Sequence, residues 1–196
     1  MNTVIIKYNA GNIQSVLFAL ERIGCNAIVT DDAEQIQSAD KIIFPGVGEA
    51  STAMQYLKER NLDTLICSLK QPLLGICLGM QLMCDYSEEN DTQCLGIFKD
   101  VNVKKFSGDL KIPQVGWNTV LFDDASLLFK GIKPMPYCYF VHSYYAEVCN
   151  ETAATTEYGI QFSSALQKNN FYGVQFHPEK SAGMGERILR NFLEYV

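Results

Sequence analysis

The feature that most constrains the fold is an apolar run that leads through Gly-x-Cys-x-Gly into a helical stretch. Residues 73–76 are apolar and follow a proline, which indicates a short buried strand. Residues 78–85 are rich in leucine and methionine and predict a helix. Cys77 stands between them, and Gly75 and Gly79 lie two residues to either side of it. This order predicts a nucleophile elbow, a sharp turn that lifts a reactive side chain above the edge of a sheet.

Cys77 itself has two interpretations at this point. A thiol at the start of a helix lies near aligned N–H groups and the positive end of the helix dipole, and both favour the thiolate. Free cysteine is also among the most buried residue types, so a core cysteine between two packing glycines would fit the same letters. The segment alone leaves both interpretations open.

Apolar strand-like runs alternate with helical patterns through the first part of the chain. Each strand-like run is apolar throughout, which is typical of a parallel sheet covered by helices on both faces. Gly24 is well placed to end the first helix. The strands expected here cover residues 3–8, 26–30, 41–44 and 73–76, and the helices cover residues 13–23, 31–40, 50–57 and 62–69.

The pattern changes after a polar loop at residues 87–93. The apolar runs then become short and numerous, which favours a meander of strands attached to the parallel sheet. A final helix is expected over residues 181–196. We therefore expect an α/β fold with an open, mostly parallel sheet, helices on both faces and an antiparallel β extension, in a single domain over residues 1–196. The additional strands are expected at residues 101–105, 119–122, 137–147, 153–156, 162–167 and 171–176.

Composition argues against several classes of protein. A formal charge of −6 over 196 residues argues against a nucleic-acid-binding protein, which normally carries a basic patch. The longest apolar run, near residues 73–80, is far shorter than the roughly 20 residues that span a bilayer. We therefore do not expect this chain to span a membrane. The first residues lead straight into a strand-like run, and no signal peptide is visible.

The cysteine and histidine counts bear on redox state and metals. The seven cysteines are odd in number and none forms Cys-x-x-Cys, which points to reduced thiols in the cytoplasm. With only two histidines, a His/Cys zinc cluster has little to build on. We therefore expect a cytoplasmic protein with no metal and no cofactor.

A cysteine nucleophile needs a base, and the base needs a group that orients it. His177 directly follows the strand expected at residues 171–176, and Pro178 stiffens the turn behind it. Because sites in α/β sheets gather outside the carboxyl ends of the strands, Cys77 and His177 are expected to share one edge. Glu179 is close enough in sequence to reach the far ring nitrogen, as the acid of a triad does.

The histidines also allow other interpretations. A strand-end histidine that is satisfied by backbone groups, with Glu179 simply solvated, would fit the same letters. His142 competes for the role of base, but no acidic residue stands within three positions of it. We therefore favour His177.

The loop Pro-Gly-Val-Gly at residues 45–48 follows another expected strand and precedes a helix. Its glycines let backbone N–H groups turn into a concavity that can bind an oxyanion. An ordinary strand-to-helix turn, or an anion site for phosphate, would fit the same letters. Neither G-x-G-x-x-G nor the P-loop pattern occurs, which disfavours a nucleotide cradle.

Taken together, three motifs resemble the class I glutamine amidotransferase family, whose active site is a Cys-His-Glu triad. They lie at residues 45–48, 75–81 and 173–181, and the resemblance extends over essentially the whole chain. Within this family the chain is most similar to the glutaminase subunits of imidazole glycerol phosphate synthases, which serve histidine biosynthesis. The softer motifs that support this narrower match lie at residues 8–12, 112–118 and 140–144.

The resemblance implies a role for each matching residue. Cys77 would attack the side-chain amide carbon of glutamine, and His177, held by Glu179, would act as base and then protonate the departing ammonia. Water would then hydrolyse the glutamyl thioester to glutamate. The residues that would bind the oxyanion are Gly46, Val47 and Gly48, and those that would hold the amino and carboxylate groups of the substrate are Gln81, Ser143 and Tyr144.

The resemblance also implies a partner. Ammonia would pass into a (βα)8-barrel cyclase subunit of imidazole glycerol phosphate synthase, with which the chain would form a heterodimer. Trp117, His142 and Lys180 match positions near that interface, although a lone tryptophan is also common in protein cores. The chain departs from many relatives at residues 49–51, which lack an aromatic residue, and at residues 114–115, where His-Met is common.

Two other functions stay open at this stage. A sister glutaminase that feeds anthranilate, aminodeoxychorismate or amino-sugar synthesis would carry the same triad. The segments at residues 110–118 and 139–145, with residue 180, favour the histidine pathway over these. A thiol hydrolase or a non-catalytic sensor on the same elbow would show thiol reactivity without glutaminase activity and would not need Glu179.

Overall fold

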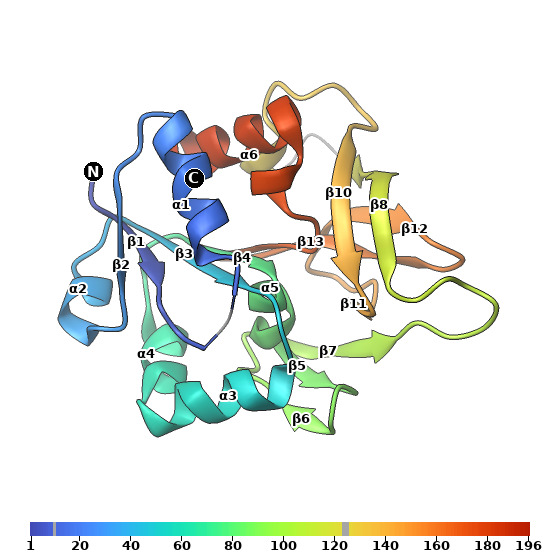
Figure 1. The fold of residues 1–196 in the computed structure, drawn as a ribbon, viewed down its shortest axis with the longest axis horizontal. Helices are drawn as coiled ribbons and strands as arrows, with labels where there is room; N and C mark the ends of the chain where they lie inside the picture. Colours follow the sequence, from blue (N-terminus) through green and yellow to red (C-terminus); the bar gives the residue numbers. More distant parts are fainter. Residues whose placement is uncertain (10, 123–125) are drawn as a thin grey trace.

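A twelve-stranded mixed sheet runs through the part of the chain that this computed structural model describes, residues 1–9, 11–122 and 126–196 (Figure 1). Five neighbouring strands at one end of the sheet are parallel to one another. Three of them, β1, β3 and β4, are buried along nearly their whole length. This burial on both faces is what their continuous apolar runs predict. In spatial order the five are β2 (Ala27–Thr30), β1 (Thr3–Ile6), β3 (Lys41–Gly46), β4 (Leu73–Cys77) and β14 (Phe171–Val174).

Helices cover both faces of these parallel strands (Figure 1). On one face, Leu20 of the first helix and Phe192 of the last join one buried apolar cluster with Ile43 and Ile76 of the sheet. The helices of that face are α1 (Ile13–Arg22) and α6 (Ala182–Tyr195). Those of the other face are α2 (Ala33–Gln37), α3 (Ala50–Glu59), α4 (Leu62–Ser68) and α5 (Leu78–Met83).

The second half of the chain extends the sheet beyond β14 and adds a small separate sheet. The expected fold class, with its parallel core and antiparallel β extension, is confirmed. The extension consists of β13 (Gln161–Lys168), β11 (Tyr144–Ala146), β7 (Phe98–Lys105), β5 (Cys84–Ser87) and β6 (Thr92–Gln93), with β12 (Thr152–Glu157) and β9 (Leu121–Phe122) to one side. The small sheet consists of β8 (Gln114–Thr119) and β10 (Tyr137–His142), and two 3-10 turns are η1 (Leu127–Phe129) and η2 (Pro178–Lys180).

The strand expected at residues 41–44 is longer in the structure and includes Pro45 and Gly46. Strand β1 pairs with β3 only as far as Ile43, so the missing N–H of Pro45 interrupts no pairing with β1. The extra residues pair with β4 instead, and Gly46 lies opposite Cys77. This register places the glycine loop directly beside the cysteine.

Two further boundaries differ from expectation. The helix expected at residues 78–85 ends at Met83, because the chain from Cys84 onward pairs with β7 as strand β5. The strand expected at residues 137–147 is two strands, β10 and β11, and the interruption is at Ser143. Pairing with distant strands decides both boundaries.

Strand β8 was not expected before Thr119, since its sequence mixes polar, apolar and glycine residues. It forms because it pairs along its whole length with β10, about twenty residues further along the chain. The strand expected at residues 119–122 is therefore divided between the end of β8 and the two residues of β9.

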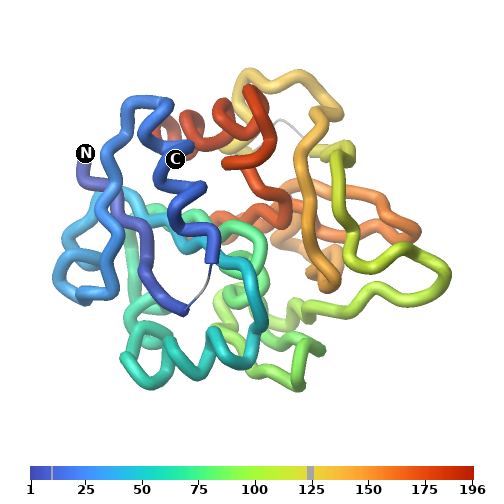
Figure 2. Tube along the Cα trace, viewed as in Figure 1, coloured from blue at the N-terminus to red at the C-terminus, as the bar shows by residue number. Residues whose placement is uncertain are grey.

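The two ends of the chain lie close together (Figure 2). Met1 and Leu193 line the same cavity, and Lys41 of β3 contacts the main chain of Val196. Within the described ranges, every helix is too short or too polar to cross a membrane.

Candidate active site

Cys77 ends β4 in a strained backbone conformation, with φ 52° and ψ −108°. A positive φ is uncommon for a residue with a side chain and indicates a sharp turn. The glycine on its helical side is required, because a Cβ atom on Gly79 would lie 1.8 Å from the carbonyl oxygen of Phe44. A Cβ atom on Gly75 would lie 2.8 Å from the backbone nitrogen of Met80. The two glycines therefore let α5 pack directly against the sheet behind the cysteine, as a nucleophile elbow demands.

His177 and Glu179 lie at the same edge of the sheet as Cys77. Strand β14, which leads to the histidine, pairs with β4 up to Val174 opposite Ile76. The histidine Nδ1 and the Glu179 Oε1 are 2.7 Å apart, and the two side chains are 1% and 0% exposed. The His177 ring is therefore held in place by a buried carboxylate.

The charges around His177 favour a protonated ring. Burial by itself lowers the pKa of His177, but the nearby Cys77 sulfur and the Glu179 carboxylate outweigh it and raise the pKa to about 10. The Nε2 atom is buried and bonds to no described residue, which leaves it free to exchange a proton with the sulfur. The arrangement suits a protonated imidazole beside the Cys77 sulfur.

Asn12 is a fourth member of this cluster, and sequence reasoning missed it. Its side-chain nitrogen contacts Glu179 Oε1 and lies 3.5 Å from His177 Nδ1. Asn12 precedes α1 with φ 73°, yet its side chain makes no capping bond because it is turned towards the glutamate. It belongs to the motif at residues 8–12, of which Ala10 lies outside the described residues. That motif was the available signal.

His142 has a different environment from His177. Its Nδ1 donates to the carbonyl oxygen of Tyr144 at 2.7 Å. Burial lowers the pKa of His142 to about 4 despite this bond, and the charge of His177 acts in the same direction. A ring that stays neutral and has no carboxylate partner is a poorer candidate for the base than His177.

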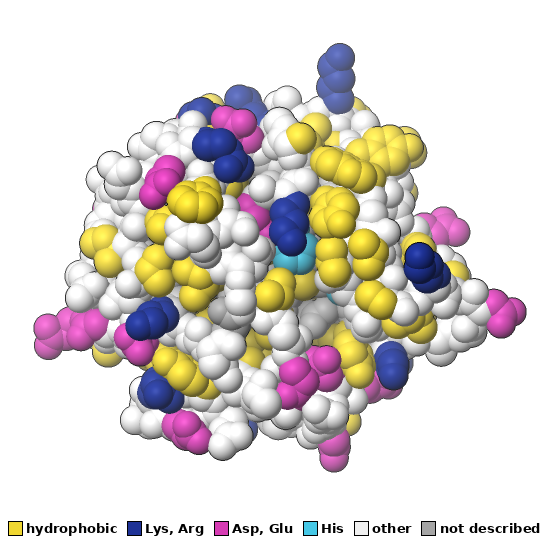
Figure 3. All heavy atoms as spheres, in the orientation of Figure 1, with side chains coloured by type: hydrophobic (Ala, Val, Ile, Leu, Met, Phe, Trp, Pro, Cys, Tyr) yellow, Lys and Arg dark blue, Asp and Glu magenta, His cyan; other side chains and the backbone are white. Residues whose placement is uncertain are grey.

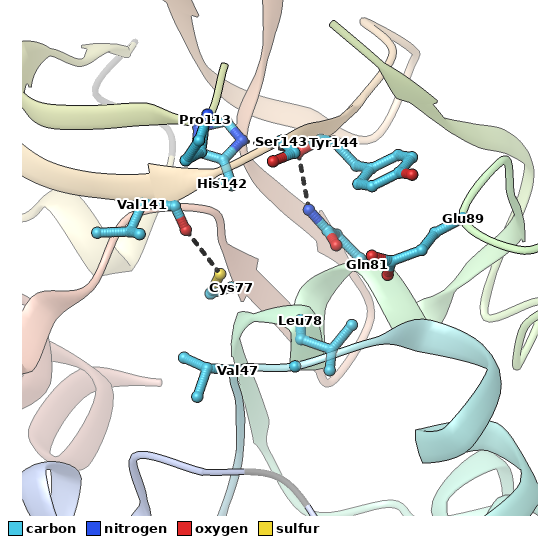
Figure 4. A pocket seen from close by; sticks show the side chains of 11 residues that line it. Val47, Cys77, Leu78, Gln81, Glu89, Pro113, Val141, His142, Ser143 and Tyr144 are labelled. Carbon is cyan, nitrogen blue, oxygen red and sulfur yellow. Dashed lines mark hydrogen bonds between the residues drawn. The ribbon is translucent and has the colours of Figure 1, made fainter.

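A cavity of about 270 Å³ opens above Cys77 (Figure 4). Residues from the glycine loop, from the elbow and from the segment after β10 surround it, and Gly46 lies just outside. A Cβ atom on Gly46 would lie 2.1 Å from the Tyr8 hydroxyl, so a larger residue there would have to displace the buried Tyr8 side chain. The residues that line the cavity are Val47, Gly48, Cys77, Leu78, Gln81, Glu89, Pro113, Val141, His142, Ser143 and Tyr144.

Glu89 is a second lining residue that sequence reasoning missed. It stands in the polar segment between β5 and β6, and its carboxylate accepts a hydrogen bond from the backbone N–H of Ala50 at 2.8 Å. Burial raises its pKa above the ordinary value, and the charge of Glu49 acts in the same direction. In sequence it was one of several acidic residues in a loop, and nothing local marked it.

Gln81 connects the opposite walls of the cavity (Figure 4). Its side-chain nitrogen donates to the carbonyl oxygen of Tyr144 at 2.9 Å and to Gln175 Oε1 at 2.9 Å. The main chain of the segment after β10 is thereby fixed relative to α5.

The residues expected at a partner interface are placed differently from one another. Trp117 is 51% exposed on β8, so the interpretation as a core tryptophan is wrong. Lys180 is exposed in η2, whereas His142, the last residue of β10, is buried and lines the cavity. Among the described residues, no group of three or more His, Cys, Asp or Glu side chains could hold a metal ion.

Curated relatives match this chain over nearly its whole length. Subunit HisH of imidazole glycerol phosphate synthase from Bacteroides thetaiotaomicron is 56% identical over 99% of this chain and 100% of its own length. The subunit of the same name from Vibrio cholerae is 48% identical over 98% of both chains.

Solved structures support the fold. A crystal structure of a glutamine amidotransferase has a TM-score of 0.75 at 19% identity and covers 97% of both chains. The structure of PurLQS from Thermotoga maritima has a TM-score of 0.72 at 13% identity, over 99% of this chain and 98% of the other. The family model described as "Glutamine amidotransferase class-I" matches residues 4–196. The chain therefore belongs to the class I glutamine amidotransferase family.

Proposed function

We propose that this chain is the glutaminase subunit of an imidazole glycerol phosphate synthase and that residues 1–196 act as one glutamine amidotransferase domain. It hydrolyses glutamine to glutamate and ammonia and supplies the ammonia to a synthase in histidine biosynthesis. The observation that carries the proposal is the strained Cys77 beside the buried His177–Glu179 pair, at the floor of a cavity.

Cys77 is the nucleophile in this reaction. As a thiolate, its sulfur attacks the side-chain amide carbon of glutamine and forms a tetrahedral intermediate. His177 carries the proton and passes it to the departing nitrogen, which leaves as ammonia. The same ring then takes a proton from water as the water hydrolyses the thioester, and the sulfur leaves as a thiolate. Glu179 holds the ring throughout.

Backbone N–H groups stabilise the negative oxygen of the intermediate. Leu78 starts helix α5, and Val47 and Gly48 line the cavity on the other side of the sulfur. Gly48 has φ 129°, a conformation that side chains rarely adopt, so the loop depends on glycine here. Gly46, which pairs with Cys77, anchors this loop to the sheet.

The cavity has groups that suit the other end of glutamine. The Glu89 carboxylate supplies a negative charge that attracts the substrate's ammonium group. Because Gln81 uses its nitrogen for protein contacts, its oxygen is left as an acceptor for the same group. The main chain at Ser143 and Tyr144 closes the opposite wall and supplies donors for the substrate carboxylate.

The partner is a (βα)8-barrel cyclase subunit, and the two chains form a heterodimer. The two-stranded sheet β8–β10 presents an exposed apolar face, over which hydrophobic side chains gather in Figure 3. Val115, Trp117 and Tyr137 on this face are 56%, 51% and 62% exposed. Val141 of the same sheet lines the cavity, so a partner seated here would lie next to the point at which ammonia forms.

Seven unpaired thiols fit a reducing compartment, and we infer that the enzyme works in the cytoplasm.

The experiment that tests the function measures glutamate release by the purified chain alone and after addition of the cyclase subunit with its ligand. Release should be slow alone, should rise strongly in the complex and should vanish in Cys77→Ala. If Cys77→Ala kept the stimulated rate, the nucleophile would be wrong. A wild-type chain stimulated by another synthase and not by this cyclase would contradict the pathway.

A further inference from the structure

Gln175 is a fully buried amide that contacts the nucleophile. It lies just after β14 and two residues before His177, with an exposed fraction of 0%. Its Nε2 donates to Cys77 Sγ at 3.6 Å, and its Oε1 accepts from Gln81 Nε2 at 2.9 Å. The steps proposed for Cys77 and His177 do not use this residue, although its side chain joins the Cys77 sulfur to Gln81 on the wall of the cavity.

The orientation of the Gln175 amide follows from its neighbours. The main-chain carbonyl of Tyr144 can only accept, so Gln81 must present its nitrogen to it. The second N–H of that nitrogen faces Gln175, which must therefore present its oxygen. The nitrogen of Gln175 is then directed to Cys77, so the sulfur receives a donor and not an acceptor.

A second contact competes for the same sulfur. The carbonyl oxygen of Val141 lies 3.8 Å from Cys77 Sγ and can accept a hydrogen bond from the neutral thiol. A carbonyl oxygen repels a thiolate, whereas an N–H group attracts it, so the two contacts favour opposite charge states of the sulfur. The donor from Gln175 is on the side of the reactive form.

We propose that Gln175 is a further catalytic residue, whose side-chain N–H stabilises the Cys77 thiolate while its oxygen holds Gln81 in position. This inference rests on the proposed function, in which Cys77 is the nucleophile. The hydrogen bond is strongest when the sulfur is negatively charged. It therefore acts twice in each cycle, before the attack on glutamine and when the sulfur leaves the thioester.

The test is the rate at which iodoacetamide alkylates Cys77 in the folded chain, measured at a series of pH values from 4 to 8. Mass spectrometry of the peptides after digestion reads the extent of alkylation. Alkylation consumes the thiolate and requires neither glutamine nor the cyclase. The exposed Cys67 in the same chain is an internal reference for reagent and for handling. The two variants are Gln175→Met, which removes both contacts, and Gln175→Asn, which is too short to make both at once and retains a polar amide.

Asn191→Leu is a matched control, because Asn191 is also a fully buried amide but bonds to the carbonyls of Leu128 and Lys130, away from the cavity. We expect both Gln175 variants to slow Cys77 alkylation about tenfold or more on the acidic limb of this pH profile, as loss of a hydrogen bond to a charged group implies. Cys67 alkylation should not change, and the control should alkylate Cys77 at the wild-type rate even where it lowers the melting temperature.

Wild-type alkylation of Cys77 in either folded Gln175 variant would overturn the inference. An equal slowing in Asn191→Leu would also overturn it, because the effect would then be one of general destabilisation. Failure of the proposed function gives a different result, the absence of stimulated glutamate release by the wild-type complex. The alkylation assay reads the sulfur in either case.

Discussion

The side-chain amide of Asn12, just before the first helix, contacts the same oxygen of Glu179 that His177 binds, across 167 positions of the chain. The glutamate therefore has two partners on one oxygen. One is the ring that it orients, and the other is a neutral donor that restrains the carboxylate itself. The N-terminal βα unit thus takes part in holding the pair of Glu179 and His177.

Replacing Asn12 should reduce turnover without weakening substrate binding. In Asn12→Gly the positive φ is kept without strain, but Glu179 loses its donor, so kcat should fall about tenfold while KM for glutamine stays unchanged. Asn61→Gly is the control, because Asn61 also precedes a helix with positive φ and no side-chain cap. Steady-state kinetics of both variants in complex with the cyclase would check this, and equal kcat values would contradict the role of Asn12.

Glu89 should matter for substrate affinity. Glu89→Gln keeps the size of the side chain but removes the negative charge from the cavity wall, so KM for glutamine should rise about tenfold with a smaller change in kcat. Glu88→Gln is the matched control, because the neighbouring carboxylate is exposed and bonds to the backbone of Lys105 instead. A rise in KM of the same size in both variants would show that the effect is one of net charge.

The lowered pKa of His142 should make stability depend on pH in the mildly acidic range. Its pKa falls from 6.5 in the unfolded chain to about 4 in the folded one, so the unfolded state binds the extra proton first. The stabilisation is fully present above pH 6.5 and is lost as pH falls towards 4, by about 3 kcal/mol at most.

His177 does not obscure this effect, because its raised pKa changes stability only between pH 6.5 and about 10. Below pH 6.5 its contribution is complete and constant. Melting temperatures of the wild type and of His142→Asn should therefore converge as the pH is lowered from 6.5 to 5. If the melting temperatures of the two proteins changed by the same amount over that pH range, His142 would not be the titrating group.

Gly79→Ala should destabilise the fold by about 3 kcal/mol or more, because the added methyl group would overlap the backbone of Phe44. The control is Gly183→Ala, in helix α6, where a Cβ atom meets nothing within 4 Å. That variant should gain about 0.5–1 kcal/mol. Urea unfolding of both measures the difference. If Gly79→Ala unfolded like the wild type, the close contact between α5 and the sheet would be wrong.

Trp117 should contribute to partner binding and not to folding. Trp117→Ala should weaken binding of the cyclase by about 2 kcal/mol, roughly 30-fold, with little change in the melting temperature. Phe18→Ala on helix α1 is the control, because both side chains are 51% exposed. Titration calorimetry with the cyclase would separate the two variants, and equal affinities would place the interface elsewhere.

The elbow was predictable from sequence because its causes are local. An apolar run of four residues, a cysteine and two glycines at fixed spacing determine the strand, the turn and the start of the helix through backbone sterics. The parallel order of the first strands follows in the same way from continuous apolar runs that alternate with helices. His177 and Glu179 could be predicted as a pair because they stand two residues apart just after an expected strand.

Some strand and helix boundaries, and the partners of several polar side chains, were decided by the tertiary structure alone, because they depend on residues far apart in the chain. Strand β8 exists through its pairing with β10, and α5 ends at Met83 because the next residues pair with β7. The contacts of Asn12 with Glu179 and of Gln175 with Cys77 join residues 167 and 98 positions apart. A local sequence window carries the propensities of its own backbone, whereas the partner of a polar side chain is set by the packing of the whole sheet.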